Sequence, residues 1–220
     1  MILFNDADVN AALPVLEKAV TVFAGQFCMT GSRLLVQRDI ADKVREGIAA
    51  RLRAVKVGPA SDPTSDMGPL IDKANVPRVE QVVVAAIAAG AKAIVRGGPF
   101  EEGPLAKGAF FRPALLEVSD AKADIVRQET FGPVVTLQVF EDEAEAVALA
   151  NDSEYGLAAS VWTRDVDRSF GLLKHWMLAR CGSTTGQQPT PAPKTAASSS
   201  PASAAWTGSP SSRTSLSTSP

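Results

Sequence analysis

Two stretches near the start of the chain show apolar side chains at the three- and four-residue spacing of an amphipathic helix. In the first stretch these residues are Leu13, Leu16, Val20 and Phe23. In the second stretch they are Ile40, Val44, Ile48 and Leu52. Asp6 or Asp8 precedes the first stretch and Asp39 the second, and aspartate is a favoured N-cap residue. The pattern predicts two helices that each pack one face against a core.

Short apolar runs rich in β-branched residues alternate with helical stretches along the rest of the chain. The runs typical of buried strands are residues 34–36, 93–95, 134–140 and 157–162. Helical periodicity continues at residues 79–89, 143–150 and 165–174. Strands that alternate with helices are typical of an α/β fold with a mainly parallel sheet and flanking helices. We therefore predict one such domain over residues 1–175.

The composition changes sharply after this domain. Of the 39 residues from 182 to 220, 33 are Ser, Thr, Pro, Ala or Gly. Such a segment buries too little apolar surface to offset the entropy lost on ordering. We therefore expect residues 176–220 to form a disordered tail.

Charge and cysteine content narrow the classes of function. The net charge of −2 provides no broad basic surface for nucleic acid. No apolar run approaches the ~18 residues of a membrane span, and the first residues lack the features of a secretory signal. Two cysteines, Cys28 and Cys181, do not suggest a disulfide framework, and the single His175 has no metal-ligand neighbours. We expect a protein of a reducing, cytoplasmic setting, without metal, nucleic-acid or membrane partners.

Cys28 is the residue with the clearest chemical potential. It lies between two small residues, Gly25 and Gly31, that leave backbone amides accessible around the sulfur. Arg33 follows closely, and a nearby positive charge favours the thiolate form of a cysteine. The alternative is a buried structural cysteine that packs as a small apolar side chain. On these features alone both interpretations stay open.

Five motifs, in order, resemble those of the aldehyde dehydrogenase superfamily. The segment Gly-Gln-Phe-Cys at residues 25–28, followed by Ser32 and Arg33, is similar to the family's cysteine active-site signature. About a hundred residues later, residues 128–134 resemble its Glu-x-Phe-Gly-Pro motif, and residues 151–163 resemble its Asn-x-x-x-Tyr-Gly-Leu segment. Residues 66–70 and 111–113 also fit. The resemblance implies the catalytic domain of the aldehyde dehydrogenase fold, present here as an incomplete fragment.

The resemblance also implies an activity and its residues. Cys28 would be the nucleophile that adds to a small-molecule aldehyde, and a thiohemiacetal and a thioester would follow with NAD or NADP as the oxidant. Glu129 would accept hydrogen bonds from the ribose of the nicotinamide half, and Phe131 would hold the nicotinamide ring. Without the resemblance, Glu129 would be a solvated acid in a loop and Phe131 a core residue.

Several parts of the family are expected to be missing. The family's water-activating glutamate, its oxyanion-binding asparagine and its βαβ units precede the cysteine, and counting back from Cys28 passes Met1. We therefore expect the chain alone to be inactive and to bind neither NAD nor NADP measurably. Two alternatives are a non-catalytic truncated product and a weak cysteine-dependent esterase. The family's oligomer-forming segment should follow residue 175, so we expect the family homo-oligomer to be lost.

The tail from residue 176 onward is predicted to be the family's C-terminal segment translated in a shifted frame. Trp176 and Met177 are each encoded by a single codon, so the bases of these two codons are known. In the frame that starts at the third base of the Trp176 codon, permitted codons for the next residues can encode an Ala-Gly-x-Val segment, which resembles a strand of the family. From Lys194 the same frame permits the family's Lys-x-Ser-Gly-x-Gly motif. The competing interpretation is a natural Ser- and Pro-rich linker. Sequencing the gene decides between them, because codons for residues 176–206 that do not encode these motifs would establish the linker.

Overall fold

The computed structural model describes residues 1–169, 171–172 and 204–205 of the chain. The predicted disordered, frame-shifted tail at residues 176–220 lies outside the described residues, except for β9 (Ala204–Ala205). This short strand pairs antiparallel with β8 (Ser160–Trp162). The predicted helix at residues 165–174 is described at 166–169 and 171–172, and these residues are helical.

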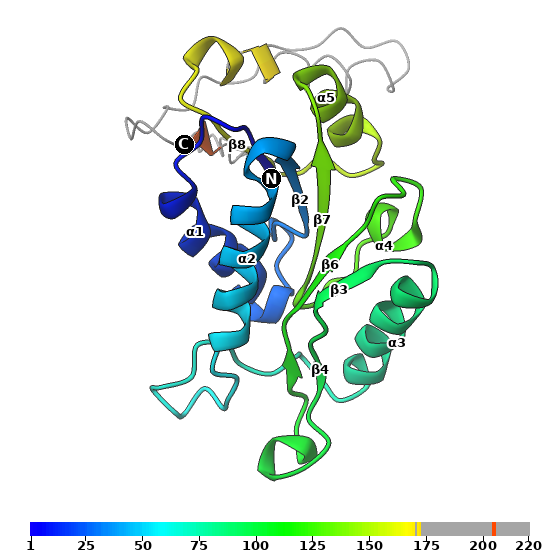
Figure 1. Cartoon of the computed structure of the whole chain (residues 1–220). Helices are drawn as coiled ribbons and strands as arrows, with labels where there is room; N and C mark the ends of the chain where they lie inside the picture. The colour runs from blue at the N-terminus through cyan, green and yellow to red at the C-terminus, as the bar shows by residue number, and fades with distance from the viewer. Residues whose placement is uncertain (170, 173–203, 206–220) are drawn as a thin grey trace, which may run out of the picture.

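A seven-stranded sheet forms the middle of the molecule, in the order β3-β6-β7-β2-β1-β8-β9 (Figure 1). Its other strands are β1 (Ile2–Leu3), β2 (Arg33–Gln37), β3 (Lys92–Val95), β6 (Ala114–Glu117) and β7 (Val134–Phe140). All neighbouring strands from β6 to β8 are parallel, whereas β3 and β9 at the two edges run antiparallel to their neighbours. The prediction of an α/β fold with a mainly parallel sheet is confirmed.

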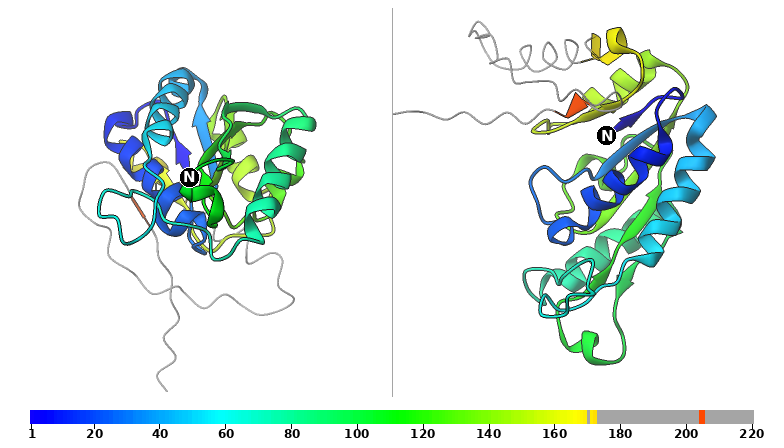
Figure 2. Two further views of the ribbon diagram at one scale, coloured as in Figure 1. Left: turned by 90° about the horizontal axis from the view of Figure 1, so that it is seen from below. Right: turned by 90° about the vertical axis from the view of Figure 1, so that its left-hand side faces the viewer.

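Helices cover both faces of this sheet (Figure 2). The helices are α1 (Val9–Thr21), α2 (Arg38–Ala54), α3 (Asn75–Ala88), α4 (Asp124–Arg127) and α5 (Glu143–Asn151). Leu34 and Val36 of β2 pack in one apolar cluster with α1 and α2, whereas Leu35 between them joins a cluster with α5. Burial on both faces explains why residues 34–36 of β2 form a continuous apolar run rather than alternating with polar residues. Among the described residues, no helix has both the length and the apolarity needed to cross a membrane.

The helix starts differ in part from the predicted ones. Asp8 is the N-cap of α1, and its carboxylate accepts a hydrogen bond of 3.1 Å from the amide of Ala11. Asp39 is not the cap of α2, because this helix already begins at Arg38 and Asp39 lies in its first turn. The negative charge still stabilises the helix there, through the partial positive charge of the N-terminus.

A two-stranded sheet projects away from the main sheet (Figure 1). It consists of β4 (Gly98–Pro99) and β5 (Phe111–Arg112), which pair antiparallel. The short 3₁₀ helix η2 (Pro104–Lys107) lies in the connection between them. This arm lies next to α3, and its base contributes Phe111 to the apolar cluster that α3 shares with β6.

Asp6 connects the start of the chain to the segment that follows β8. Its Oδ2 accepts hydrogen bonds from the Thr163 hydroxyl at 2.7 Å and from the amides of Arg164 and Asp165 at 3.0 and 3.2 Å. The Arg168 guanidinium donates to Oδ1 at 3.2 Å. Partial burial acts to raise the pKa of Asp6, but these hydrogen bonds and the charge of Arg168 outweigh it, so the pKa is lowered.

We expect Asp6→Asn to lower the free energy of unfolding by about 1–2 kcal/mol at pH 7, because the ionised carboxylate is the better acceptor. The folded pKa lies below the unfolded one, so this stabilisation is complete above the ordinary aspartate pKa of 3.8 and is lost as the pH falls through the folded pKa. Urea unfolding at several pH values measures the difference between variant and parent. Asp167→Asn, an exposed neighbour, should show no such pH-dependent difference. An equal difference at neutral and acidic pH would contradict the ionic role of Asp6.

Candidate active site

Cys28 lies in the loop that joins the 3₁₀ helix η1 (Val22–Gly25) to β2. The loop folds back on itself, because the amide of Gln26 donates to the carbonyl of Phe23 at 3.0 Å and that of Thr30 to the carbonyl of Phe27 at 2.8 Å. The cysteine between these turns is exposed. The alternative of a buried structural cysteine is therefore wrong.

The backbone of the loop before Cys28 has an unusual conformation. Phe23, Ala24 and Gly25 have φ values of 50°, 53° and 69°, so three residues in a row occupy the left-handed region. This conformation costs about 1–2 kcal/mol for each residue other than glycine. Such strain persists only where surrounding contacts hold the backbone, and it is concentrated at functional sites in proteins.

Gly25 packs directly on the segment that contains Glu129 and Phe131. A Cβ atom added to Gly25 would overlap the carbonyl of Gly132 and lie 2.8 Å from the nitrogen of Pro133. Both segments lead into neighbouring parallel strands, with Arg33 of β2 opposite Thr136 of β7. The fold therefore places the Cys28 loop beside residues 129–133, which are separated from it by about a hundred residues of sequence.

Glu129 and Phe131 are both accessible from solvent. Glu129 is exposed, and its amide donates a long hydrogen bond of 3.4 Å to the Tyr155 hydroxyl. Phe131 is 42% exposed and has a φ of 47°. The alternative of Phe131 as a core residue is therefore wrong, whereas exposure alone leaves Glu129 open to either interpretation.

The Arg33 guanidinium makes its hydrogen bonds away from Cys28, whose thiolate form it was expected to favour. Its guanidinium donates to the side-chain oxygen of Gln138 at 3.1 Å and to the carbonyl of Leu149 at 3.0 Å. Burial lowers the pKa of this guanidinium, and the charge of Arg127 acts in the same direction. Arg33 thus connects β2 to β7 and α5, and no contact among the described residues supports its expected effect on the Cys28 thiol.

Two supports of the site were not predicted from the sequence. Arg78 of α3 donates to the carbonyls of Thr130 and Phe131, at 2.7 and 3.0 Å. On the other side, Arg127 donates to Asp152 at 2.9 Å and joins the start of the segment to the end of α5. Neither arginine belongs to a motif, and the mixed polar and apolar residues around them give no signal of these contacts.

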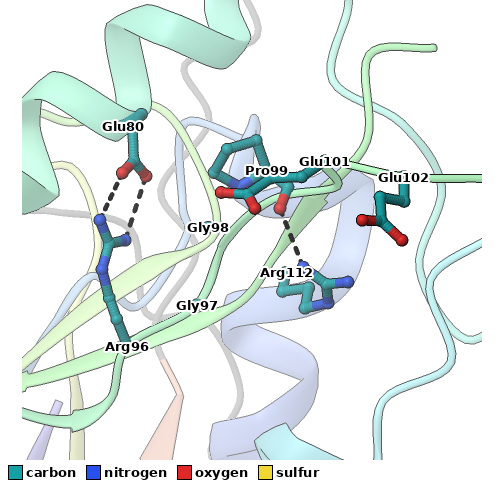
Figure 3. A pocket seen from close by; sticks show the side chains of 8 residues that line it. All are labelled: Glu80, Arg96, Gly97, Gly98, Pro99, Glu101, Glu102 and Arg112. Carbon is teal, nitrogen blue, oxygen red and sulfur yellow. Dashed lines mark hydrogen bonds and ion pairs between the residues drawn. The ribbon is translucent and has the colours of Figure 1, made fainter. Parts of the chain in front are cut away.

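A surface cavity in the described part of the chain lies away from Cys28, Glu129 and Phe131. A cavity of about 480 Å³ lies between α3 and the β4–β5 arm (Figure 3). Arg96 and Glu80 form an ion pair at its wall, and Arg112 donates to the carbonyl of Pro99 at 2.8 Å. None of the three predicted site residues lines it. The candidate active site is therefore the exposed surface around Cys28.

The chain belongs to the aldehyde dehydrogenase family, whose model matches residues 1–196. The mainly parallel sheet with its flanking helices is the aldehyde dehydrogenase fold, as predicted from the motifs. The described part of the chain contains no group of three or more side chains suited to hold a metal ion.

Betaine aldehyde dehydrogenases are among its relatives. The enzyme of Bacillus subtilis (strain 168) is 37% identical over 167 residues, which cover 76% of this chain and 34% of that protein. The crystal structure of the Staphylococcus aureus enzyme in complex with NAD⁺ matches with a TM-score of 0.76 and 38% identity, over 79% of this chain and 35% of that one. An apo variant of the same enzyme carries a BME-modified cysteine and matches equally well. The chain spans about a third of the length of these relatives.

The packing of Gly25 predicts a large effect of a single methyl group. We expect Gly25→Ala to lower the free energy of unfolding by at least about 2 kcal/mol, because the Cβ overlaps Gly132 and alanine is strained at this φ. The matched control is Gly68→Ala, where a Cβ meets no atom within 4 Å and φ is not positive. Its effect should stay within about 0.5 kcal/mol. Equal urea midpoints for the two variants would show that the Gly25 contact is not required.

Proposed function

We propose that this chain is the catalytic-cysteine part of an NAD(P)⁺-dependent aldehyde dehydrogenase, with Cys28 as the nucleophile. The observation that supports this most directly is the exposed Cys28 on a strained loop packed against residues 129–133. Family membership supplies the reaction class, and the loop supplies a nucleophile that an aldehyde can reach. Because the matched part of the chain spans only about a third of the relatives' length, the complete reaction requires further parts of the family's structure.

The proposed chemistry begins at the sulfur of Cys28. The thiolate adds to the carbonyl carbon of the aldehyde, a C–S bond forms, and the carbonyl oxygen becomes an oxyanion in a thiohemiacetal. The amide of Cys28 itself would be one donor to that oxygen. Loss of hydride leaves a thioester on Cys28, and its hydrolysis gives the carboxylic acid and returns the thiol.

The exposed residues of the neighbouring segment suit a nicotinamide nucleotide. Glu129 offers a solvent-accessible carboxylate that can accept hydrogen bonds from two ribose hydroxyls, and the half-exposed Phe131 ring offers an apolar face. Bound NAD(P)⁺ would accept the hydride from the thiohemiacetal. Solved relatives are complexes with NAD⁺, which supports this assignment for the family's cofactor.

The relatives also suggest which aldehyde to test first. They are betaine aldehyde dehydrogenases, so betaine aldehyde is a reasonable representative of the substrate class. A cytoplasmic setting follows from the proposed role of Cys28, which requires a free thiol. The exposed thiol also supports a second candidate, a weak cysteine-dependent esterase that needs no cofactor.

Reversible addition of aldehyde predicts that betaine aldehyde protects Cys28 from alkylation. In the full chain, we expect iodoacetamide to modify Cys28 several-fold more slowly with the aldehyde present, as read by peptide mass spectrometry. Betaine, which lacks the aldehyde carbonyl, should give no protection, and Cys181 in the same sample reports the reactivity of an ordinary thiol.

Two results would weigh against the proposed nucleophile. Equal slowing at Cys28 and Cys181 would show that the aldehyde reacts with any thiol and that the Cys28 loop adds nothing. For the esterase candidate, hydrolysis of p-nitrophenyl acetate must fall to the background rate in Cys28→Ala and persist in Cys181→Ala. If Cys28→Ala leaves the hydrolysis unchanged, that candidate fails while the aldehyde experiment still stands.

A further inference from the structure

The guanidinium of Arg78 spans two consecutive peptide carbonyls of the segment beside Cys28. Its Nη1 donates to the oxygen of Thr130 at 2.7 Å, and its Nη2 donates to the oxygen of Phe131 at 3.0 Å. The two residues differ in surroundings, because Thr130 is buried and Phe131 is half exposed. Arg78 therefore binds the backbone where the segment passes from the buried core to the exposed surface.

The backbone at this point needs external support. Phe131 has a φ of 47°, which costs a phenylalanine about 1–2 kcal/mol relative to extended backbone. The next residue, Gly132, is confined between two neighbours: its carbonyl lies against Gly25, and a Cβ built on it would lie 2.9 Å from Val79 of α3. The segment is thus wedged between the Cys28 loop and α3, and Arg78 supplies its hydrogen bonds from α3.

The orientation of Arg78 is set by the first turn of its own helix. The third donor, Nε, bonds to the side-chain oxygen of Asn75 at 2.8 Å. Asn75 in turn donates to Asp72 from its backbone amide at 3.0 Å and from its side chain at 2.9 Å. These hydrogen bonds from Asn75 lower the pKa of Asp72, so this carboxylate remains charged at neutral pH.

We propose that Arg78 is a positioning residue, which holds the Thr130–Phe131 backbone so that Glu129 and Phe131 face outward beside Cys28. This inference rests on the proposed function, in which those two side chains contact the nicotinamide half of the cofactor. The planar guanidinium is suited to the task because three of its N–H groups reach fixed acceptors at once. A lysine ammonium at the end of a flexible stem cannot reproduce this geometry.

A ¹⁹F reporter at residue 131 tests the proposal without any cofactor. The full chain is prepared with a trifluoromethyl-phenylalanine in place of Phe131, alone and together with Arg78→Met or Arg78→Lys. We expect one sharp resonance with Arg78 and a second or strongly broadened resonance in both variants, because the ring samples more than one backbone conformation. Arg78→Lys keeps the charge and most of the stem, so it guards against a variant that fails to fold.

Arg96→Met is the matched control. Arg96 forms an ion pair with Glu80 of α3, the helix that also contains Arg78, at the wall of the cavity in Figure 3. Its described hydrogen bonds do not reach residues 130–131. A role limited to global stability would shift the urea midpoint of the Arg78 variants but leave the native resonance single, as in Arg96→Met. A single unshifted resonance in both Arg78 variants would overturn the proposal. The resonance at residue 131 is measured independently of Cys28 alkylation, so failure of the positioning role is distinguishable from failure of the proposed function.

Discussion

The backbone contact between Gly25 and Gly132 is the constraint on which the rest of the site depends. No side chain separates the two peptides, so the loop before Cys28 and the segment after Glu129 approach as closely as two chains can. The contact is possible because β2 and β7 are adjacent and parallel, which brings both strand starts to the same end of the sheet. A larger residue at Gly25 would push the two segments apart and so separate the thiol from Glu129 and Phe131.

Strain is concentrated on both sides of this contact. The described non-glycine residues with positive φ are Phe23, Ala24 and Phe131, and all three lie within two residues of Gly25 or Gly132. The apolar core, by contrast, consists of regular strands and helices with both sheet faces covered. A rigid core of this kind can hold a strained site, because the energy of packing exceeds the local cost of the unusual backbone.

The arginines around the site act mainly on the backbone. Arg33 and Arg78 donate to peptide carbonyls, and Arg127 pairs with Asp152 at the end of α5. These arginines therefore connect separate segments of the chain. None of the hydrogen bonds named here reaches the thiol of Cys28. Arginine suits this work because it offers several donors in a fixed plane and stays protonated.

The sequence determined the regular part of the fold. The three- and four-residue spacing predicted α1 and α2, and the apolar runs predicted β2, β3 and β7, because burial of one helix face or both strand faces leaves a local pattern. Phe23, the last apolar position predicted for the first helix, lies beyond the end of α1 and is 71% exposed. Motifs identified the family, and the resemblance predicted Cys28, Glu129 and Phe131 as site residues. The two-residue strand β1 was not foreseen, since so short a stretch has no periodicity to detect. The four-residue strand β6 was missed because its sequence, Ala-Leu-Leu-Glu, contains no β-branched residue typical of strands.

Only the tertiary structure decided how the site is held together. Arg33 is close to Cys28 in sequence, yet its guanidinium reaches Leu149, which is 116 residues away. Arg78 belongs to no motif, yet it supports Thr130 at a separation of 52 residues. Local sequence records which side chains are buried within an element. The partner of a polar group depends instead on the order of the strands and on how the helices pack, and these are properties of the whole chain.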